Sequence, residues 1–307
     1  MKTNSKTVRR KSPHMVRTRR AGLIGLGLMG AAFAQRLRAA GWEVLGFDLS
    51  PACRRRARSL GVQLARDAAE VFAGCDRVVL SLPTLRETET VLAEAKRALR
   101  PGHLLLDTTT GEPAQTVAIH RRLAARGVRY LDTTISGNSG QVAAGDDVLT
   151  MVGGDADAFA AARGLLRALT PRVRHVGPSG SGARMKLVTN LVLGLNRAAL
   201  AEGLCFAERL GFTRRAALEV LLASKAYSTI MDTKGEKMVT EDFTPQARLS
   251  QHLKDVRLML KAARAARFRL PFTRVHRQLL EAAERAGLGA LDNSALIKVL
   301  AGSTKKR

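Results

Sequence analysis

The chain has 307 residues, with 51 Lys and Arg against 26 Asp and Glu, so its formal net charge is +25. Its hydrophobic content of 46% supports a sizeable core and excludes a wholly disordered chain, and its length suits two domains. The three cysteines form no Cys-x-x-Cys pair, which excludes the usual zinc and disulfide frameworks and indicates a reducing, cytoplasmic compartment.

Both ends of the chain are basic. Residues 1–20 hold eight Lys and Arg and no acid, and residues 304–307 hold three more. We predict that both ranges are disordered basic tails, since they have almost no apolar residues with which to pack. Their charge could neutralise nucleic-acid phosphates. Solvated arginines are the favoured explanation, because the chain has no aromatic-basic RNA motif or DNA-reading helix, so nucleic-acid contact is an expectation for the tail alone.

From Ala21, short apolar runs alternate with helical segments. Strands are expected at 21–25, 43–48, 77–82, 103–109, 127–134 and 147–154, and helices at 28–41, 51–61 and 85–100. Strands that alternate with helices of about ten or more residues indicate a parallel sheet with right-handed crossovers. The pattern predicts an α/β domain of the Rossmann type, with a mainly parallel sheet, over residues 21–178.

After residue 178 the strand signals stop. Residues 182–210 read as one helix, roughly 45 Å long at the usual rise per residue. Further helices are expected near 213–224, 247–266, 271–287 and 292–301. The second domain, 179–303, is therefore expected to be all-helical and built on the long interdomain helix. The polar residues within the apolar stretch 185–201 argue against a membrane span.

The stretch "GLGLMG" at residues 25–30 follows the first strand and opens the first helix. In a Gly-x-Gly-x-x-Gly loop of this kind, Gly25 permits the tight turn, Gly27 lets the backbone approach a pyrophosphate, and Gly30 lets helix and strand pack closely. The positive end of the helix then faces the phosphates. The whole loop is predicted to bind a dinucleotide cofactor through Gly25, Leu26, Gly27, Leu28, Met29 and Gly30.

Asp48 closes the second strand, 23 residues after Gly25. A carboxylate at this place accepts hydrogen bonds from ribose hydroxyls and repels a 2′-phosphate, which favours NAD as the cofactor. Arg54, Arg55 and Arg56 follow closely and could bind that phosphate, so NADP is the alternative.

Lys186 and Asn190 stand four residues apart on the long helix and so share one face. Their neighbours are apolar in nearly every direction, which is typical of a buried helix. Burial lowers the pKa of a lysine and suits it to donate or accept a proton. The alternative is a lysine that snorkels to solvent from the first turns of the helix.

Two further segments carry polar groups. "DTTISGNSG" at 132–140 is a loop of small residues whose backbone N–H groups and side chains at Ser136, Gly137 and Asn138 could bind a carboxylate, although by itself it reads as an ordinary turn. "LKDVRLM" at 253–259 places Lys254 and Asp255 on a helix, where by themselves they read as a solvated charge pair.

Together these segments resemble the β-hydroxyacid dehydrogenase family, which includes 3-hydroxyisobutyrate, tartronate semialdehyde and 6-phosphogluconate enzymes. The resemblance runs from about Ala21 to Ser303. It includes, in order, "GLGLMG", "SLPT" at 81–84, "DTTT" at 107–110, "SG" at 136–137, "GSGARMKLVTN" at 180–190, "HLKD" at 252–255 and "GLGALDNSALI" at 287–297. Several motifs in the right order are far more specific than any one of them.

The resemblance implies roles for particular residues. Lys186 is expected to be the general acid/base and Asn190 a substrate-orienting residue, while a small carboxylate-bearing substrate is held by Ser136, Gly137 and Asn138. Leu82, Pro83, Thr110 and Lys254 are expected to contact the nicotinamide cofactor. The resemblance also implies a homodimer or tetramer, and no metal ion is expected in the site.

The chain departs from the family around the substrate pocket. The loop that usually reads D-A-P-V-S-G-G has Thr133, Thr134 and Asn138 in place of Ala, Pro and the second Gly. These changes put the identity of the substrate in doubt and leave the lysine intact. The expected function is hydride transfer between NAD and a small 3-hydroxy acid or the matching semialdehyde. The alternatives are an imine reductase, a group that usually lacks the lysine, and a non-catalytic, nucleic-acid-associated relative.

Overall fold

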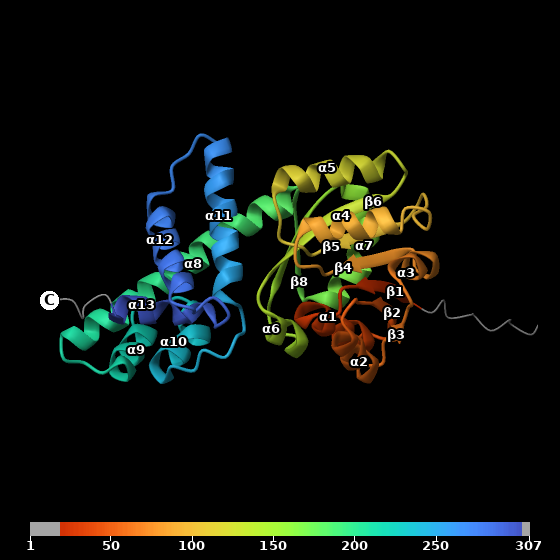
Figure 1. Cartoon of the computed structure of the whole chain (residues 1–307). Coiled ribbons are helices and arrows are strands. Elements are labelled where there is room, and N and C mark those ends of the chain that lie inside the picture. The colour runs from red at the N-terminus through yellow and green to blue at the C-terminus, as the bar shows by residue number, and fades with distance from the viewer. Residues whose placement is uncertain (1–18, 303–307) are drawn as a thin grey trace, which may run out of the picture.

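The computed structural model describes residues 19–302, which form a sheet domain and a helical domain joined by one long helix (Figure 1). Residues 1–18 and 303–307 lie outside the described residues. The basic tail predicted at 304–307 and nearly all of the one predicted at 1–20 therefore stay predictions. Arg20 opens the first strand, which begins one residue earlier than expected.

The first domain contains one eight-stranded sheet in the order β3-β2-β1-β4-β5-β6-β7-β8. All neighbouring strands are parallel except β6 and β7, so the predicted mainly parallel sheet is confirmed. The strands are β1 (Arg20–Ile24), β2 (Glu43–Phe47), β3 (Gln63–Leu64), β4 (Arg77–Leu80), β5 (Leu104–Asp107), β6 (Arg129–Ser136), β7 (Leu149–Gly153) and β8 (Arg172–Gly177).

Helices cover both faces of this sheet. They are α1 (Leu28–Ala39), α2 (Pro51–Ser59), α3 (Ala68–Gly74), α4 (Leu85–Glu94), α5 (Pro113–Ala124), α6 (Ser139–Ala144) and α7 (Ala156–Leu169). Neighbouring strand residues point to opposite faces, so Leu23 packs in the core with Phe33 of α1, while Ile24 packs in the core with Phe72 of α3. Both faces are apolar because both are covered, as is usual for a parallel sheet.

Strand β8 was not predicted, and the exposure of its side chains explains why. Its sequence "RVRHVG" carries two arginines and a histidine, and its residues are exposed or only partly buried. Charged side chains are common on edge strands, because they discourage pairing with another chain. An edge strand therefore lacks the apolar run by which the inner strands of this sheet are recognised.

The second domain is all-helical, as expected. The interdomain helix α8 (Ser181–Arg209) closely matches the predicted 182–210. The other helices are α9 (Arg214–Ala223), α10 (Ile230–Thr240), α11 (Leu249–Ala265), α12 (Pro271–Arg285), the 3₁₀ turn η1 (Asn293–Leu296) and α13 (Ile297–Gly302). Two buried clusters line α8, one with α9 and α10 and the other with α11 and α12.

Helix α10 was missed because its sequence, "IMDTKGEKMVT", is a weak helix former with a central glycine. The structure supplies the reason for that glycine. A Cβ on Gly235 would lie 2.6 Å from Leu218 Cδ1 of α9, so close packing of the two helices requires a residue without a side chain.

The start of α8 is bonded to the sheet through one carboxylate. Asp132, buried on β6, accepts hydrogen bonds from the backbone N–H groups of Gly180 and Ala183, each 2.8 Å long. Thr134 Oγ1, two residues further on β6, donates to the Gly182 carbonyl at 2.9 Å. A carboxylate suits a helix N-terminus, where backbone donors are otherwise unpaired and the helix dipole is positive.

Gly182 is required for this close approach. A Cβ at this position would lie 2.6 Å from the Asp132 carbonyl oxygen and 2.9 Å from that of Met151. Both are backbone atoms of the sheet and cannot move aside like the end of a flexible side chain. The sequence places a glycine where α8 crosses β6 and β7 because no larger residue fits there.

We predict that Gly182→Ala destabilises the protein, although alanine favours helices. The strained contact should lower the free energy of unfolding by about 1–3 kcal/mol, as overpacking usually does. Gly203→Ala is the matched control on the same helix, since nothing lies within 4 Å of its added Cβ. That control should stabilise the protein by about 0.5–1 kcal/mol. Urea denaturation measures both, and equal effects would contradict the packing explanation.

Candidate active site

The loop between β1 and α1 has the geometry of a phosphate-binding turn. Gly25 has a φ of +91°, and a Cβ there would lie 2.2 Å from the Ser81 carbonyl oxygen. A Cβ on Gly30 would lie 2.0 Å from the Gly25 carbonyl oxygen. These two glycines let the loop fold tightly against the end of β4, as the sequence predicts.

Gly27 has a different environment. It is the N-cap of α1 and offers no side-chain hydrogen bond to the helix, and nothing lies within 4 Å of a Cβ built on it. The open space lies at the N-terminus of a helix, where backbone N–H groups face outwards and the dipole attracts an anion. The residues present therefore fit the pyrophosphate of a dinucleotide. A side chain at position 27 would fill the space that the pyrophosphate needs.

Asp48 is bonded to this loop. Its half-buried carboxylate accepts the N–H of Leu26 at 2.6 Å and the N–H of Ser50 at 2.7 Å. Arg56 approaches from α2 and donates to the Leu26 carbonyl at 3.0 Å. Each carboxylate oxygen keeps a further lone pair that can accept a hydroxyl proton. The acid and the arginine thus lie at the same edge of the loop, where NAD and NADP differ.

A cavity of about 820 Å³ lies between the two domains. It is lined by most of the site residues that the sequence predicts outside the glycine loop. These are Leu82, Pro83, Thr110, Ser136, Gly137, Asn138, Lys186 and Asn190, and Met29 of the loop joins them. Segments far apart in the sequence are thus brought to one place.

Lys186 lies at the centre of this group. Its Nζ donates a 2.5 Å hydrogen bond to the Ile135 carbonyl, next to Ser136 in the substrate loop. Burial of the ammonium lowers the pKa of Lys186 to about 8, although the nearby Asp255 carboxylate acts in the opposite direction. A lysine with such a pKa can give up and regain a proton near neutral pH.

Asn190 is held by Asp255 of α11. Its Nδ2 donates to Asp255 Oδ2 at 3.0 Å, which fixes the amide and leaves its carbonyl oxygen for the cavity. Asp255 is buried, which excludes the solvated charge pair that Lys254 and Asp255 would indicate by themselves. Burial raises the pKa of Asp255, against the effects of Lys254, Lys186 and the Asn190 amide.

Lys254 lies beside Asp255 and faces the sheet domain. Its Nζ donates to the Thr110 carbonyl at 3.3 Å, and further along α11 Lys261 forms a 2.7 Å ion pair with Glu112. Helix α11 is thereby held against the loop that follows β5, on the side of the helical domain that faces the sheet (Figure 1). Lys254 and Thr110, both predicted to contact the cofactor, are in direct contact with each other.

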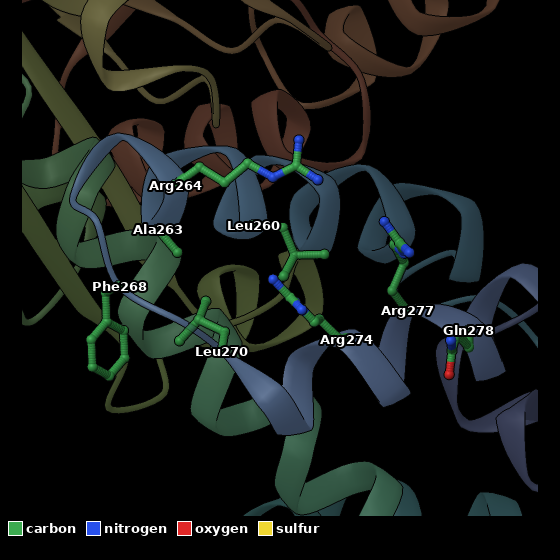
Figure 2. A pocket seen from close by; sticks show the side chains of 8 residues that line it. All are labelled: Leu260, Ala263, Arg264, Phe268, Leu270, Arg274, Arg277 and Gln278. Atoms are coloured by element: carbon green, nitrogen blue, oxygen red, sulfur yellow. The ribbon is translucent and has the colours of Figure 1, made fainter.

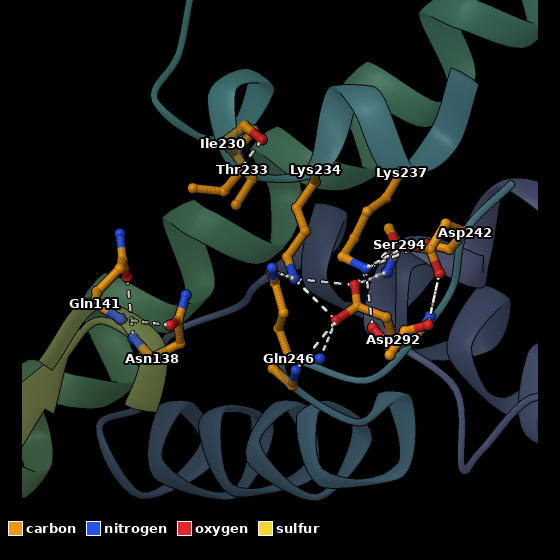
Figure 3. Close-up of polar contacts among 12 residues, drawn as sticks. Asn138, Gln141, Ile230, Thr233, Lys234, Lys237, Asp242, Gln246, Asp292 and Ser294 are labelled. Carbon is orange, nitrogen blue, oxygen red and sulfur yellow. Dashed lines mark hydrogen bonds and ion pairs between the residues drawn. The ribbon is translucent and has the colours of Figure 1, made fainter. Parts of the chain in front are cut away.

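The substrate loop has one unexpected feature. Asn138 is the N-cap of α6, where its side-chain oxygen accepts the Gln141 N–H and its own N–H donates to the Gln141 side chain, both at 3.0 Å (Figure 3). This capping box occupies the side-chain oxygen and the backbone N–H of Asn138, and it leaves the side-chain Nδ2 of Asn138 available to donate to a carboxylate. Asn138 therefore shapes the loop, and its Nδ2 remains a candidate donor beside the backbone and hydroxyl of Ser136 and the backbone of Gly137.

Several polar residues of the cavity were not predicted as site residues. Among them are Arg197, Lys234, His252, Asp255 and Asn293. The helical periodicity offered one signal for Arg197, since it lies eleven residues after Lys186 and hence on nearly the same face of α8. The others come from α10, α11 and η1, and no local pattern connects them with the lysine.

A second, smaller cavity of about 330 Å³ lies at the turn between α11 and α12 (Figure 2). It is lined largely by Leu260, Leu270, Phe268 and arginines, and contains none of the predicted site residues. Within residues 19–302 there is no cluster of three or more His, Cys, Asp or Glu suited to hold a metal ion. Nor does the described part of the chain contain a helix long and apolar enough to cross a membrane.

The fold and the site define an NAD(P)-binding oxidoreductase of two domains, with the glycine loop at one end of the cleft and a partly buried lysine at the other. Comparison with known families supports this class. The NAD-binding domain of 6-phosphogluconate dehydrogenase matches residues 20–177. The NAD-binding domain of NADP-dependent 3-hydroxyisobutyrate dehydrogenase matches residues 180–300. The chain belongs to the β-hydroxyacid dehydrogenase family.

Individual relatives support this family assignment. The chain is 32% identical to an L-threonate dehydrogenase of Cupriavidus necator over 93% of its own length and 97% of the relative. It is also 32% identical to a 2-(hydroxymethyl)glutarate dehydrogenase of Eubacterium barkeri, over 93% and 96%. The structure of a 3-hydroxyisobutyrate dehydrogenase from Salmonella typhimurium superposes with a TM-score of 0.85 at 27% identity, over 92% of this chain and 99% of that one.

We predict that Gly27→Ala weakens cofactor binding and leaves folding intact. The added methyl group meets no protein atom but fills the space proposed for a pyrophosphate, so the dissociation constant of NAD⁺ should rise by about tenfold or more. Gly164→Ala on α7 is the matched control, with equally open surroundings far from the loop. Calorimetric titration with NAD⁺ and thermal melting test the pair. Unchanged affinity in Gly27→Ala would contradict the phosphate site.

Proposed function

We propose that the protein transfers a hydride between NAD and a small hydroxy acid, or reduces the matching semialdehyde, with Lys186 as the general acid/base. The observation that carries the proposal is the environment of Lys186. Its ammonium is bonded to the substrate loop and its pKa is lowered by burial to about 8, within a cavity that adjoins the glycine loop.

The residues of this chain have distinct tasks in that reaction. During oxidation the neutral Lys186 Nζ takes the proton of the substrate hydroxyl, and during reduction the ammonium returns a proton to the carbonyl oxygen. The nicotinamide, when bound, supplies or accepts the hydride. Asn190, held by Asp255, orients the oxygen that gains or loses the proton. Ser136 and Gly137 hold the substrate carboxylate.

The acidic residue at the end of β2 favours NAD over NADP in this proposal. A carboxylate at Asp48 would lie close to a 2′-phosphate and repel it. Arg56 lies nearby but already donates to the Leu26 carbonyl, so part of its hydrogen-bonding capacity is used.

The proposal includes a dimer or tetramer. Helix α8 was expected to be buried all round, yet Met185, Val188 and Val192 are 40%, 56% and 50% exposed in the single chain. They form one apolar stripe because they are three and four residues apart. A second copy of the chain packed on this stripe would bury these side chains. Light scattering at micromolar concentration should therefore show a dimer or tetramer, and a monomer would contradict this part of the proposal.

We predict that Lys186→Ala lowers kcat by about 10²–10⁴-fold, the usual contribution of a general acid/base, and leaves NAD⁺ binding intact. In the wild type, oxidation needs the neutral amine, so its rate should rise as the pH increases through about 8. Reduction needs the ammonium, so its rate should fall over the same range. NADH absorbance with a panel of short 3-hydroxy acids and semialdehydes measures both directions.

Lys225→Ala, an exposed lysine, serves as the control for charge removal and should keep wild-type rates. A Lys186→Ala enzyme with near wild-type kcat, or with an unchanged pH profile, would show that another group moves the proton.

We predict that Asp48→Ser raises the ratio of kcat/KM for NADP⁺ over NAD⁺ by about tenfold or more, because it removes the repulsion of the 2′-phosphate. Loss of the bonds to Leu26 and Ser50 should weaken both cofactors alike, so the ratio is the informative quantity. A wild-type enzyme that already prefers NADP⁺ would overturn the assignment and point to the arginines of α2.

A further inference from the structure

Arg197 is a second cation on the same face of α8 as Lys186. It lies eleven residues further on, which is three helical turns, or roughly 16 Å along the axis. The side chain lines the cavity between the domains and is only 4% exposed. A guanidinium stays charged in proteins, so its burial is costly unless its donors are paired.

The donors of Arg197 are not paired. Its Nε and Nη2 are buried, and neither has a hydrogen-bond partner within residues 19–302. Unpaired buried polar groups are rare in folded proteins, and two unpaired donor atoms on one guanidinium that lines a cavity indicate a missing acceptor.

The nearest carboxylate is fully used elsewhere. Asp292 Oδ1 and Oδ2 each accept from Lys234 Nζ at 2.9 Å (Figure 3). Its remaining lone pairs accept the N–H and hydroxyl of Ser294 and the backbone N–H groups of Gln246 and Ala247, between 2.8 and 3.1 Å. Asp292 thus neutralises Lys234 and has no lone pair left for Arg197.

The histidines beside Arg197 do not compensate it either. His252 and His276 are buried and bonded through their Nε2 atoms at 3.0 Å. Burial, and then the Arg197 charge, lower the pKa of both, to about 4 for His276. Both rings are therefore neutral near pH 7. The Asp292 carboxylate acts on Arg197 only through space, and Arg197 Nε and Nη2 have no hydrogen-bonded acceptor within residues 19–302.

We propose that Arg197 binds a second anionic group of the substrate, a carboxylate or a phosphate carried several atoms away from the hydroxyl that is oxidised. The proposal rests on the function proposed above and narrows its substrate class to hydroxy acids with two anionic groups. The first carboxylate lies at the substrate loop near Lys186, and the second lies at the Arg197 guanidinium, which reaches the same cavity on a long side chain. A planar guanidinium with two unpaired nitrogen donors, Nε and Nη2, suits either anion.

The decisive comparison uses pairs of substrates that differ only in the second anion. One pair is 2-(hydroxymethyl)glutarate and 2-(hydroxymethyl)pentanoate, and the other is erythronate 4-phosphate and erythronate. The wild type should turn over the dianion of at least one pair with a kcat/KM about 10–100-fold higher, the usual effect of a charged hydrogen bond. The pair that shows the effect identifies the anion.

The variant Arg197→Met should abolish this preference by lowering kcat/KM for the dianion alone, mainly through KM. Arg197→Lys should restore part of it. Arg264→Met, on the exposed surface of α11, is the matched control and should behave as the wild type. Since the free protein buries the Arg197 charge without a partner, Arg197→Met should melt at the same or a higher temperature. A large fall in melting temperature would reveal a structural role and overturn the proposal.

Binding of glutarate, which cannot be oxidised at a hydroxyl, separates this inference from the proposed function. Calorimetry in the presence of NAD⁺ should show glutarate binding to the wild type and at least tenfold weaker binding to Arg197→Met. Loss of that binding without turnover of any hydroxy acid would support the anion site and reject the proposed function. Equal turnover of both members of each pair, unchanged in Arg197→Met, would reject the anion site and leave the function standing.

Discussion

The bond between Asp132 and the first turn of α8 is the constraint on which the site depends. Asp132 stands on β6, and its two oxygens receive the backbone N–H groups of Gly180 and Ala183. The helix can therefore leave the sheet in only one direction. One turn later Lys186 reaches the carbonyl of Ile135, three residues beyond Asp132 on the same strand. The strand thus supplies both the anchor of the helix and the loop that faces the lysine.

Because of this arrangement, α8 sets the positions of three polar residues along the cavity. Lys186, Asn190 and Arg197 project from one face of it, and each lies next to a different element outside the helix. Lys186 contacts the sheet domain, Asn190 is bonded to α11, and Arg197 lies close to the neutral histidine pair. The helical rise fixes the spacing of their backbone positions, and the long side chains of Lys186 and Arg197 extend from these positions into the cavity.

The buried cations of the cavity differ in how many hydrogen bonds they make. The pair of Lys234 and Asp292 is saturated with hydrogen bonds, which favours a structural role. Lys186 has one hydrogen bond and a lowered pKa, which suits proton transfer. Arg197 has two unpaired donors, which suits a ligand. The extent to which each cation is hydrogen-bonded thus distinguishes a structural role, a role in proton transfer and a role in ligand binding within one cavity.

The sequence by itself determined the alternation of strands and helices, the glycine loop, the long helix and the shared face of Lys186 and Asn190. These features depend on residues close together in the chain, whose periodicity and backbone preferences are local properties. Edge strand β8 and helix α10 escaped prediction because their identity depends on neighbours, such as Leu218 packed against Gly235. The capping bond of Asn138 to Gln141 is also local, whereas the burial of Asp255 and the missing partner of Arg197 were decided only by the tertiary structure. Arg197 is left unpaired because Asp292, nearly a hundred residues away in sequence, is already satisfied by α10 and its following loop. No local pattern records which of two cations a distant carboxylate will neutralise.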